Sequence, residues 1–314
     1  MNPKFSFIIP LYNEEDIIET LINRMNQLIE RIESPCEVVL IDDGSCDATT
    51  RLIEELAIND SKYLCIFFSR NFGQQKAFSA GLDYSRGDYI MFLDADLQDP
   101  PELFFKFYDK ILEGYDIVYG IRENRKENIF KKTAYKTFYQ LLNRIADYPI
   151  PLDTGDFSLI NRKIANQMIK MREESRFLRG MRSWIGFKQI GLKYNRSTRA
   201  IGEPKYTFRK LLNLALDGIF NYSIFPIKFL SYCGLSCVGI SFIYFLITLI
   251  RKFVYKDVPL GFTALLFVII LFGGIQLLSI GIIGEYMQRV FFQVKNRPLY
   301  IIDKTIIDGE RHDQ

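Results

Sequence analysis

Residues 89–101 read YIMFLDADLQDPP, and this stretch indicates the fold and the chemistry to expect. The apolar run at 89–93 is typical of a buried strand, and it ends in two carboxylates, Asp94 and Asp96. Side chains alternate along a strand, so we expect both carboxylates on the same side of its carboxyl end. Carboxylates this close repel each other unless a cation lies between them, which predicts a Mg²⁺ or Mn²⁺ site with Gln98 as a further oxygen ligand. A solvated acidic turn is the alternative for this motif taken alone.

Short apolar runs and amphipathic stretches alternate on both sides of this motif. Strands are predicted at 5–10, 38–41, 64–68, 89–93 and 117–120. Helical spacing and helix-start residues predict helices at 16–32, 47–57, 74–85 and 101–113. This alternation predicts an α/β domain with a mostly parallel sheet and helices on both faces, and ligands of such sheets bind at the carboxyl ends of the strands.

Two more predicted strands also end in polar clusters. PLYNE follows at residues 10–14, and DDGS follows at residues 42–45. We expect all these strand ends to meet at one rim, where Asp42 and Asp43 suit ribose hydroxyls or a base N–H. Helix capping explains either cluster alone, but their combination with a D-x-D motif favours a ligand site.

Composition excludes several kinds of chemistry. The only histidine is His312, near the C-terminus, where chains are usually poorly ordered, so neither a catalytic triad nor a His-ligated metal is expected. The 5 cysteines form no C-x-x-C pair, which fits a reducing compartment without structural zinc. A net charge of +3 without an arginine-rich tail gives no indication of nucleic-acid binding.

The C-terminal third has a different character from the rest. Residues 229–250 and 260–283 carry no charge, and each is long enough to cross a hydrocarbon core of ~30 Å, which predicts a transmembrane hairpin rather than two buried helices. Residues 206–228 contain an amphipathic stretch suited to the membrane interface, although packing on the domain fits the same pattern. We expect 285–314 to form a juxtamembrane helix and tail. Because no signal peptide is visible, the domain at 1–205 and both termini are expected in the cytosol, on a multi-pass protein of the plasma or inner membrane.

These motifs resemble those of the family 2 glycosyltransferases, whose domain has the GT-A (Rossmann-like) fold. The family carries a P-x-Y/F-N-E start, a D-D-G-S turn and a D-x-D, found here at 10–14, 42–45 and 94–96. Within the family, further segments are similar to dolichol-phosphate mannose synthase and to bacterial undecaprenyl-phosphate glucosyltransferases. These segments are RNFGQQK at 70–76, LQDPPE at 97–102, TGDF at 154–157 and RAIGEPKY at 199–206.

The resemblance implies an enzyme, a hexosyltransferase that moves a hexose onto undecaprenyl or dolichyl phosphate with inversion, using Mg²⁺ or Mn²⁺. Glucose from UDP-glucose is the donor we expect, and the lipid bilayer and further copies of the chain are the expected partners. The residues implied to hold the donor nucleotide are Pro10, Tyr12, Glu14, Asp42, Asp43 and Asp94. Those implied to hold the metal are Asp94, Asp96 and Gln98, and those for the acceptor phosphate are Arg122, Lys131, Tyr135, Arg199 and Lys205.

The catalytic residues expected are Asp96, Asp156 and Arg122, with Asp156 either a base or a positioning group. A lipid monophosphate has a second pKa of about 6 and is largely an anionic nucleophile at neutral pH, so the reaction does not require a histidine base. Two rivals remain. A processive polysaccharide synthase would carry Q-x-x-R-W, whereas Trp184 here lacks the matching glutamine. A non-catalytic nucleotide-sugar binder or scaffold would not need the intact pair Asp94 and Asp96.

Overall fold

The structure is a computed structural model that describes residues 3–123, 154–174, 176–195, 225–255 and 261–313. The chain divides into two compact units. The first comprises Met1–Tyr139, Tyr148–Tyr206 and Arg297–Gln314, and the second comprises Gln140–Asp147 and Thr207–Asn296.

The first unit contains one sheet, whose described strands have the order β7-β5-β6-β4-β1-β2-β3-β8-β9. The strands are β1 (Phe5–Leu11), β2 (Cys36–Asp42), β3 (Tyr63–Phe68), β4 (Tyr89–Phe92), β5 (Ile117–Glu123), β6 (Thr154–Asn161), β7 (Gln189–Asn195), β8 (Ile302–Ile307) and β9 (Glu310–Asp313). β1 pairs in parallel with β2 and β4, and β2 pairs in parallel with β3. The parallel core predicted from the first four apolar runs is therefore confirmed.

The sheet as a whole is mixed, which corrects the expectation of a mostly parallel one. β6 lies between β4 and β5 and is antiparallel to both, and β8 is antiparallel to β3. The strand–helix alternation that predicted parallel pairing ends before β6. Strand direction beyond that point depends on long-range pairing, for which the local sequence carries no signal.

Helices cover both faces of the sheet, as predicted. They are α1 (Ile18–Glu30), α2 (Thr49–Asn59), α3 (Gln74–Tyr84), the 3-10 helix η1 (Pro101–Leu103), α4 (Phe104–Leu112), α6 (Arg162–Lys170) and α7 (Leu178–Ile185). The side chains of β1 alternate between two buried clusters: Phe7 packs with residues of α1, α2 and α4, whereas Ile8 packs with residues of α3, α6 and α7. Burial on both sides explains why the central strands are continuous apolar runs.

Residues 285–295 are helical, as expected there, whereas the residues that follow join this sheet instead of forming a tail. The hairpin of β8 and β9 extends the sheet beyond β3, and His312 lies in β9 rather than in a disordered end. Thr305 and Ile306 of β8 are buried, so this edge of the sheet is held by packing as well as by backbone hydrogen bonds.

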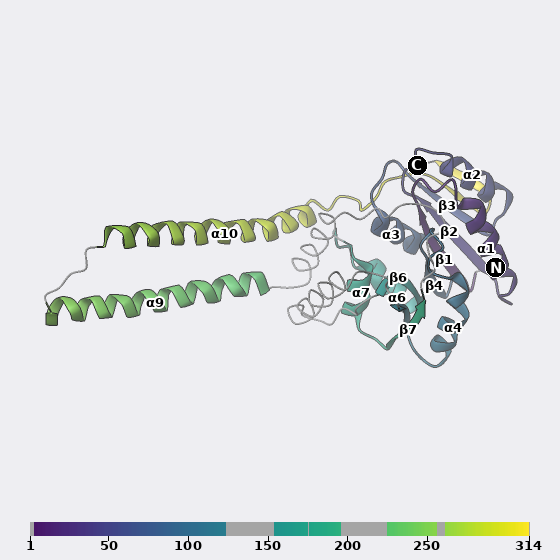
Figure 1. The fold of residues 1–314 in the computed structure, drawn as a ribbon. Coiled ribbons are helices and arrows are strands. Elements are labelled where there is room, and N and C mark those ends of the chain that lie inside the picture. Colours follow the sequence, from purple (N-terminus) through teal and green to yellow (C-terminus); the bar gives the residue numbers. More distant parts are fainter. Residues whose placement is uncertain (1–2, 124–153, 175, 196–224, 256–260, 314) are drawn as a thin grey trace. The chain divides into compact units, whose positions relative to one another are not determined.

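Two long helices form the described part of the second unit, α9 (Phe225–Tyr255) and α10 (Phe262–Lys295), which contact each other and run in opposite directions (Figure 1). Within the described residues, Pro226–Tyr244 has the length and apolar composition of a membrane span. Most of the amphipathic segment expected at 206–228 lies outside the described residues.

Candidate active site

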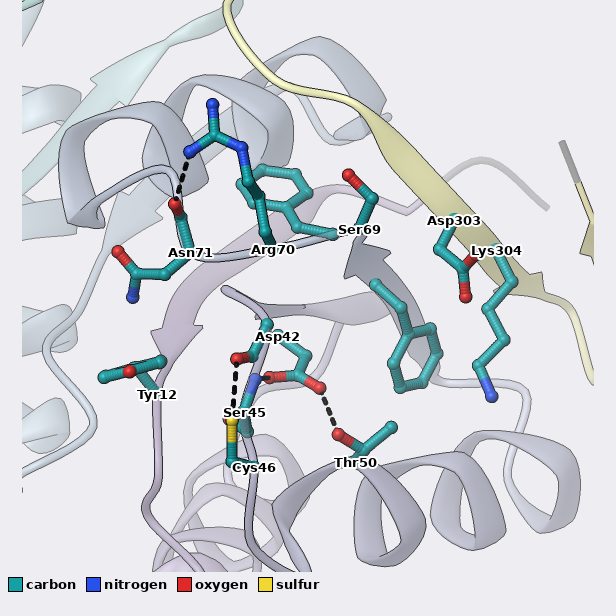
Figure 2. A pocket seen from close by; sticks show the side chains of 13 residues that line it. Tyr12, Asp42, Ser45, Cys46, Thr50, Ser69, Arg70, Asn71, Asp303 and Lys304 are labelled. Atoms are coloured by element: carbon teal, nitrogen blue, oxygen red, sulfur yellow. Dashed lines mark hydrogen bonds between the residues drawn. The ribbon is translucent and has the colours of Figure 1, made fainter.

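A cavity of about 490 Å³ opens at the carboxyl ends of β1, β2 and β3 (Figure 2). Tyr12, Asp42 and Arg70, which follow or end these three strands, all line it. The carboxylate of Asp42 is held in place by the backbone N–H of Ser45, at 2.9 Å, and by the hydroxyl of Thr50, at 2.5 Å. The cavity has the size of a small-molecule site and lies where sheets of this class bind ligands.

The D-D-G-S turn and the loop after β3 approach each other backbone to backbone. Gly44 has φ +69°, and a Cβ there would lie 2.5 Å from the carbonyl carbon of Arg70, so only glycine fits. Asp43 accepts hydrogen bonds from the backbone N–H groups of Phe72, at 2.6 Å, and Gly73, at 2.9 Å. Burial raises the pKa of Asp43 despite these bonds. In this structure Asp43 thus holds the cavity wall, whereas Asp42 lines the cavity.

The D-x-D motif lies beyond its strand. β4 ends at Phe92, and Asp94 and Asp96 belong to the turn that follows, in which Leu97 has φ +54°. The alternation of strand side chains therefore does not apply to them, and the turn instead places both in one acidic cluster. Burial, followed by the charges of Asp99, Asp156 and Asp96, raises the pKa of Asp94 to about 7.

The positive charge of Arg122 in β5 partly offsets the negative charge of this cluster. Its guanidinium donates to the buried carboxylate of Asp99 at 2.9 Å and to the phenol oxygen of Tyr194 at 3.3 Å, and it lies 3.9 Å from Asp94. The structure thus places Arg122, predicted as a catalytic and phosphate-binding residue, beside the D-x-D carboxylates. The partners Asp99 and Tyr194 were not foreseen, because they come from separate segments that only the fold brings together.

Asp156 of β6 is 5% exposed. It accepts hydrogen bonds from Arg179 of α7, at 3.1 Å, and from the side chain of Gln75, at 2.9 Å. Burial alone would raise the pKa of Asp156, but Arg179, Arg182 and Gln75 outweigh it and hold the pKa below its usual value. A carboxylate with a lowered pKa is a weak proton acceptor, so of the two roles left open the geometry favours positioning over general base.

The segment 70–76 connects the parts of the site. Gln74 donates to Asp94 at 2.8 Å, and the next residue, Gln75, reaches Asp156, while the backbone of Gly73 holds Asp43. The sequence indicated this segment only through its resemblance, and neither glutamine was predicted to have a role. The available signal was a pair of adjacent amide side chains at the start of a predicted helix, with the next predicted strand followed by two carboxylates.

The donor set suits a hard divalent cation with few protein ligands. Among the described residues, no group of three or more His, Cys, Asp or Glu side chains is arranged to hold a metal ion. Asp94 and Asp96 offer two carboxylates, and burial together with the neighbouring carboxylates raises the pKa of Asp94. Mg²⁺ and Mn²⁺ accept such sites when substrate phosphates and water fill the other positions. The backbone N–H of Gln98 donates to Asp96 at 3.1 Å.

The roles of all the predicted site residues stay predictions. Pro10 lies within β1, and the backbone N–H of Glu14 donates to the hydroxyl of Thr49 at 2.9 Å. The four remaining residues predicted for the acceptor phosphate lie outside the described residues: Lys131, Tyr135, Arg199 and Lys205.

An α/β domain with a cavity at the ends of its parallel strands and an acidic cluster after a further strand of the same sheet is typical of enzymes that use nucleotide-activated donors. The model of glycosyl transferase family 2 matches residues 6–169. The chain belongs to this family and is a glycosyltransferase, as the sequence motifs indicated.

Relatives match over nearly the full chain. The uncharacterized glycosyltransferase YkcC of Bacillus subtilis (strain 168) is 41% identical, over 96% of this chain and 94% of that protein. The SfII prophage-derived bactoprenol glucosyl transferase of Shigella flexneri is 37% identical, over 96% of this chain and 98% of that protein. Among solved structures, the glucosyl-3-phosphoglycerate synthase from Mycobacterium tuberculosis in complex with Mn²⁺, UDP and glucosyl-3-phosphoglycerate is 18% identical, covers 69% of this chain and 78% of its own, and gives a TM-score of 0.44. A similarity this distant says nothing about the ligands of this chain.

Proposed function

We propose that this protein transfers glucose from UDP-glucose to a polyprenyl phosphate, with inversion, at the cytosolic face of a membrane. The observation that carries the proposal is the 37% identity to a protein named bactoprenol glucosyl transferase, which extends over 96% of this chain and so includes the helical hairpin as well as the catalytic domain. A lipid acceptor explains why a sugar-transferring domain would be joined to such a hairpin.

The exposed apolar surface of the hairpin supports a membrane location. Leu235 of α9 is 70% exposed and Leu277 of α10 is 73% exposed, and large apolar side chains are exposed along both helices. A contiguous apolar surface of this kind is unfavourable in water and favourable in lipid. We propose that both helices cross the bilayer, that the segment 206–228 lies at the interface, and that the catalytic domain and both termini are cytosolic.

The chemistry follows from the charges around the acidic cluster. The donor nucleoside occupies the cavity beside Tyr12 and Asp42, with its diphosphate directed toward Asp94 and Asp96. A Mg²⁺ or Mn²⁺ ion held by these two carboxylates would neutralise the charge that develops on the leaving diphosphate. Asp156, fixed by Arg179, positions the reacting groups.

The acceptor phosphate needs orientation rather than deprotonation. One of its anionic oxygens forms the bond to the anomeric carbon as the bond to the diphosphate breaks, and no proton has to be removed. We propose that Arg122 guides this oxygen, together with Lys131, Tyr135, Arg199 and Lys205 from the segments outside the described residues. Cations suit this role because charge-assisted hydrogen bonds to phosphate are strong.

The test is a donor panel. Purified full-length protein in detergent is incubated with undecaprenyl phosphate, Mn²⁺ or Mg²⁺, and UDP- and GDP-hexoses, and the lipid product is identified by mass. We expect undecaprenyl phosphate that carries one hexose when UDP-glucose is the donor. Formation of product only from a GDP-sugar would refute the donor assignment, and equal transfer to water-soluble hydroxyl compounds would refute the lipid acceptor.

A further inference from the structure

The strand that follows the helical hairpin reaches into the nucleotide cavity. β8 begins at Ile302, shortly after α10 ends at Lys295. Two of its residues, Asp303 and Lys304, line the cavity. Figure 2 shows that their side chains extend from this strand, across the cavity from Tyr12. A wall of the proposed donor site is therefore supplied by the segment farthest from it in sequence.

A β-bulge explains how two consecutive side chains reach one cavity. Along a regular strand, neighbouring side chains point to opposite faces. Here Phe67 pairs with Lys304 but Phe68 pairs with Ile302, so Asp303 is an extra residue without a partner on β3. Bulges next to binding sites redirect side chains in this way. The bulge thus allows the consecutive residues Asp303 and Lys304 to line the same cavity.

Lys304 is held with its ammonium group available for more bonds. It is 12% exposed, lies 4.8 Å above the ring of Phe67, and donates to Glu54 of α2 at 2.5 Å. An ammonium group has three donors, and the bond to Glu54 uses one. Glu54 also pairs with Arg311 of β9 at 3.1 Å. Arg311 does not line the cavity.

The β-hairpin formed by β8 and β9, which carries Lys304, is firmly attached to the catalytic domain. Arg86 donates to both oxygens of Asp308, in the turn between β8 and β9, at 3.1 and 3.2 Å, and to the buried Glu37 at 2.8 Å. At the other end of β8, Tyr300 stacks on Phe68 with 5.1 Å between ring centroids. These contacts fix the wall before a ligand arrives, which lowers the entropic cost of binding.

We propose that Lys304, with Asp303 beside it, binds the nucleoside of the donor, so that the segment after α10 completes the donor site. The proposal rests on the proposed function in taking the occupant to be a nucleotide. By linkage, the bound nucleotide stabilises the docked state of β8 and β9, and loss of that docking weakens nucleotide binding.

The first test compares Lys304→Met with Arg311→Met. Both variants remove a cation that pairs with Glu54, but only Lys304 lines the cavity. UDP binding to the full-length protein in detergent, with Mn²⁺ and without acceptor, is measured by calorimetry. We expect Lys304→Met to weaken UDP binding on the order of tenfold and Arg311→Met to bind like the wild type. Equal affinities of the two variants would overturn the proposal.

A second test needs no substitution. UDP should slow amide hydrogen exchange in β8 of the wild-type protein, because nucleotide binding suppresses opening of the strand. UDP that slows exchange around Asp42 and leaves β8 unchanged would overturn the proposal. Normal UDP binding without any lipid product in the donor panel would instead refute the proposed function and leave this inference standing.

Discussion

The side-chain amide of Gln74 donates a 2.8 Å hydrogen bond to the carboxylate of Asp94, joining the first residue of α3 to the D-x-D motif. The bond comes from the loop that also borders the nucleotide cavity, since Arg70 and Asn71 line that cavity. The segment 70–76 therefore both lines the cavity and donates a hydrogen bond to the proposed metal ligand Asp94.

Gln74→Leu should lower kcat/KM by about tenfold, because Asp94 loses the donor that orients it while the volume of the side chain is kept. The apparent affinity for Mn²⁺ should fall, and UDP binding measured without metal should stay unchanged. Gln27→Leu, at an exposed position of α1, is the matched control. Wild-type Mn²⁺ dependence in Gln74→Leu would contradict a positioning role.

Asp96→Ala should abolish transfer and leave the fold intact, because the side chain lies at the rim of the sheet and not in its core. We expect a loss of at least about a hundredfold, the scale of losing charge stabilisation in a transition state. Excess EDTA should have the same effect on the wild type, reversed by added Mn²⁺. Turnover that is indifferent to the chelator would contradict the metal assignment.

Arg179→Met should destabilise the domain by about 3 kcal/mol at neutral pH, because it leaves the buried carboxylate of Asp156 without its main counter-charge. In the wild type the pKa of Asp156 lies below its usual value, so its contribution to stability is lost only under strong acid. In the variant the counter-charge of Arg179 is gone, so we expect the pKa of Asp156 to rise relative to the wild type. The deficit in Tm should therefore be largest near pH 7 and shrink as the pH falls toward about 4.

Two controls separate this effect from general damage. Arg51→Met removes an exposed ion pair with Glu55 and should change Tm very little. Asp156→Asn combined with Arg179→Met should recover part of the lost stability, because no buried charge is left unpaired. A pH-independent deficit in Arg179→Met would show that lost packing, and not the charge of Asp156, is responsible.

Gly44→Ala should disrupt the nucleotide cavity more than Gly73→Ala. Both glycines have positive φ, so alanine adds backbone strain on the order of 1–3 kcal/mol at either position. Only at Gly44 would the new methyl group collide with the backbone of Arg70, whereas nothing lies within 4 Å of a Cβ at Gly73. UDP affinity and Tm should both fall further in Gly44→Ala, and equal losses in the two variants would contradict the role of backbone contact.

Much of the catalytic domain was predictable because its signals are local. The strands at 5–10, 38–41, 64–68 and 89–93 are apolar runs buried on both faces, and the amphipathic stretches between them formed the predicted helices. The polar clusters at their carboxyl ends met at one rim, since parallel strands end at the same edge. The motifs also indicated the family correctly.

The α/β class, the parallel core and the residues available for chemistry follow from the sequence alone, because periodicity and strand-end motifs depend only on neighbouring residues. Only the tertiary structure decided that β6 runs antiparallel, that Asp156 faces Arg179, and that β8 returns after the helical hairpin to bring Lys304 into the cavity. These features depend on pairing and charge compensation between segments far apart in the chain, and such contacts have no local pattern because either partner alone looks like an ordinary surface or strand residue.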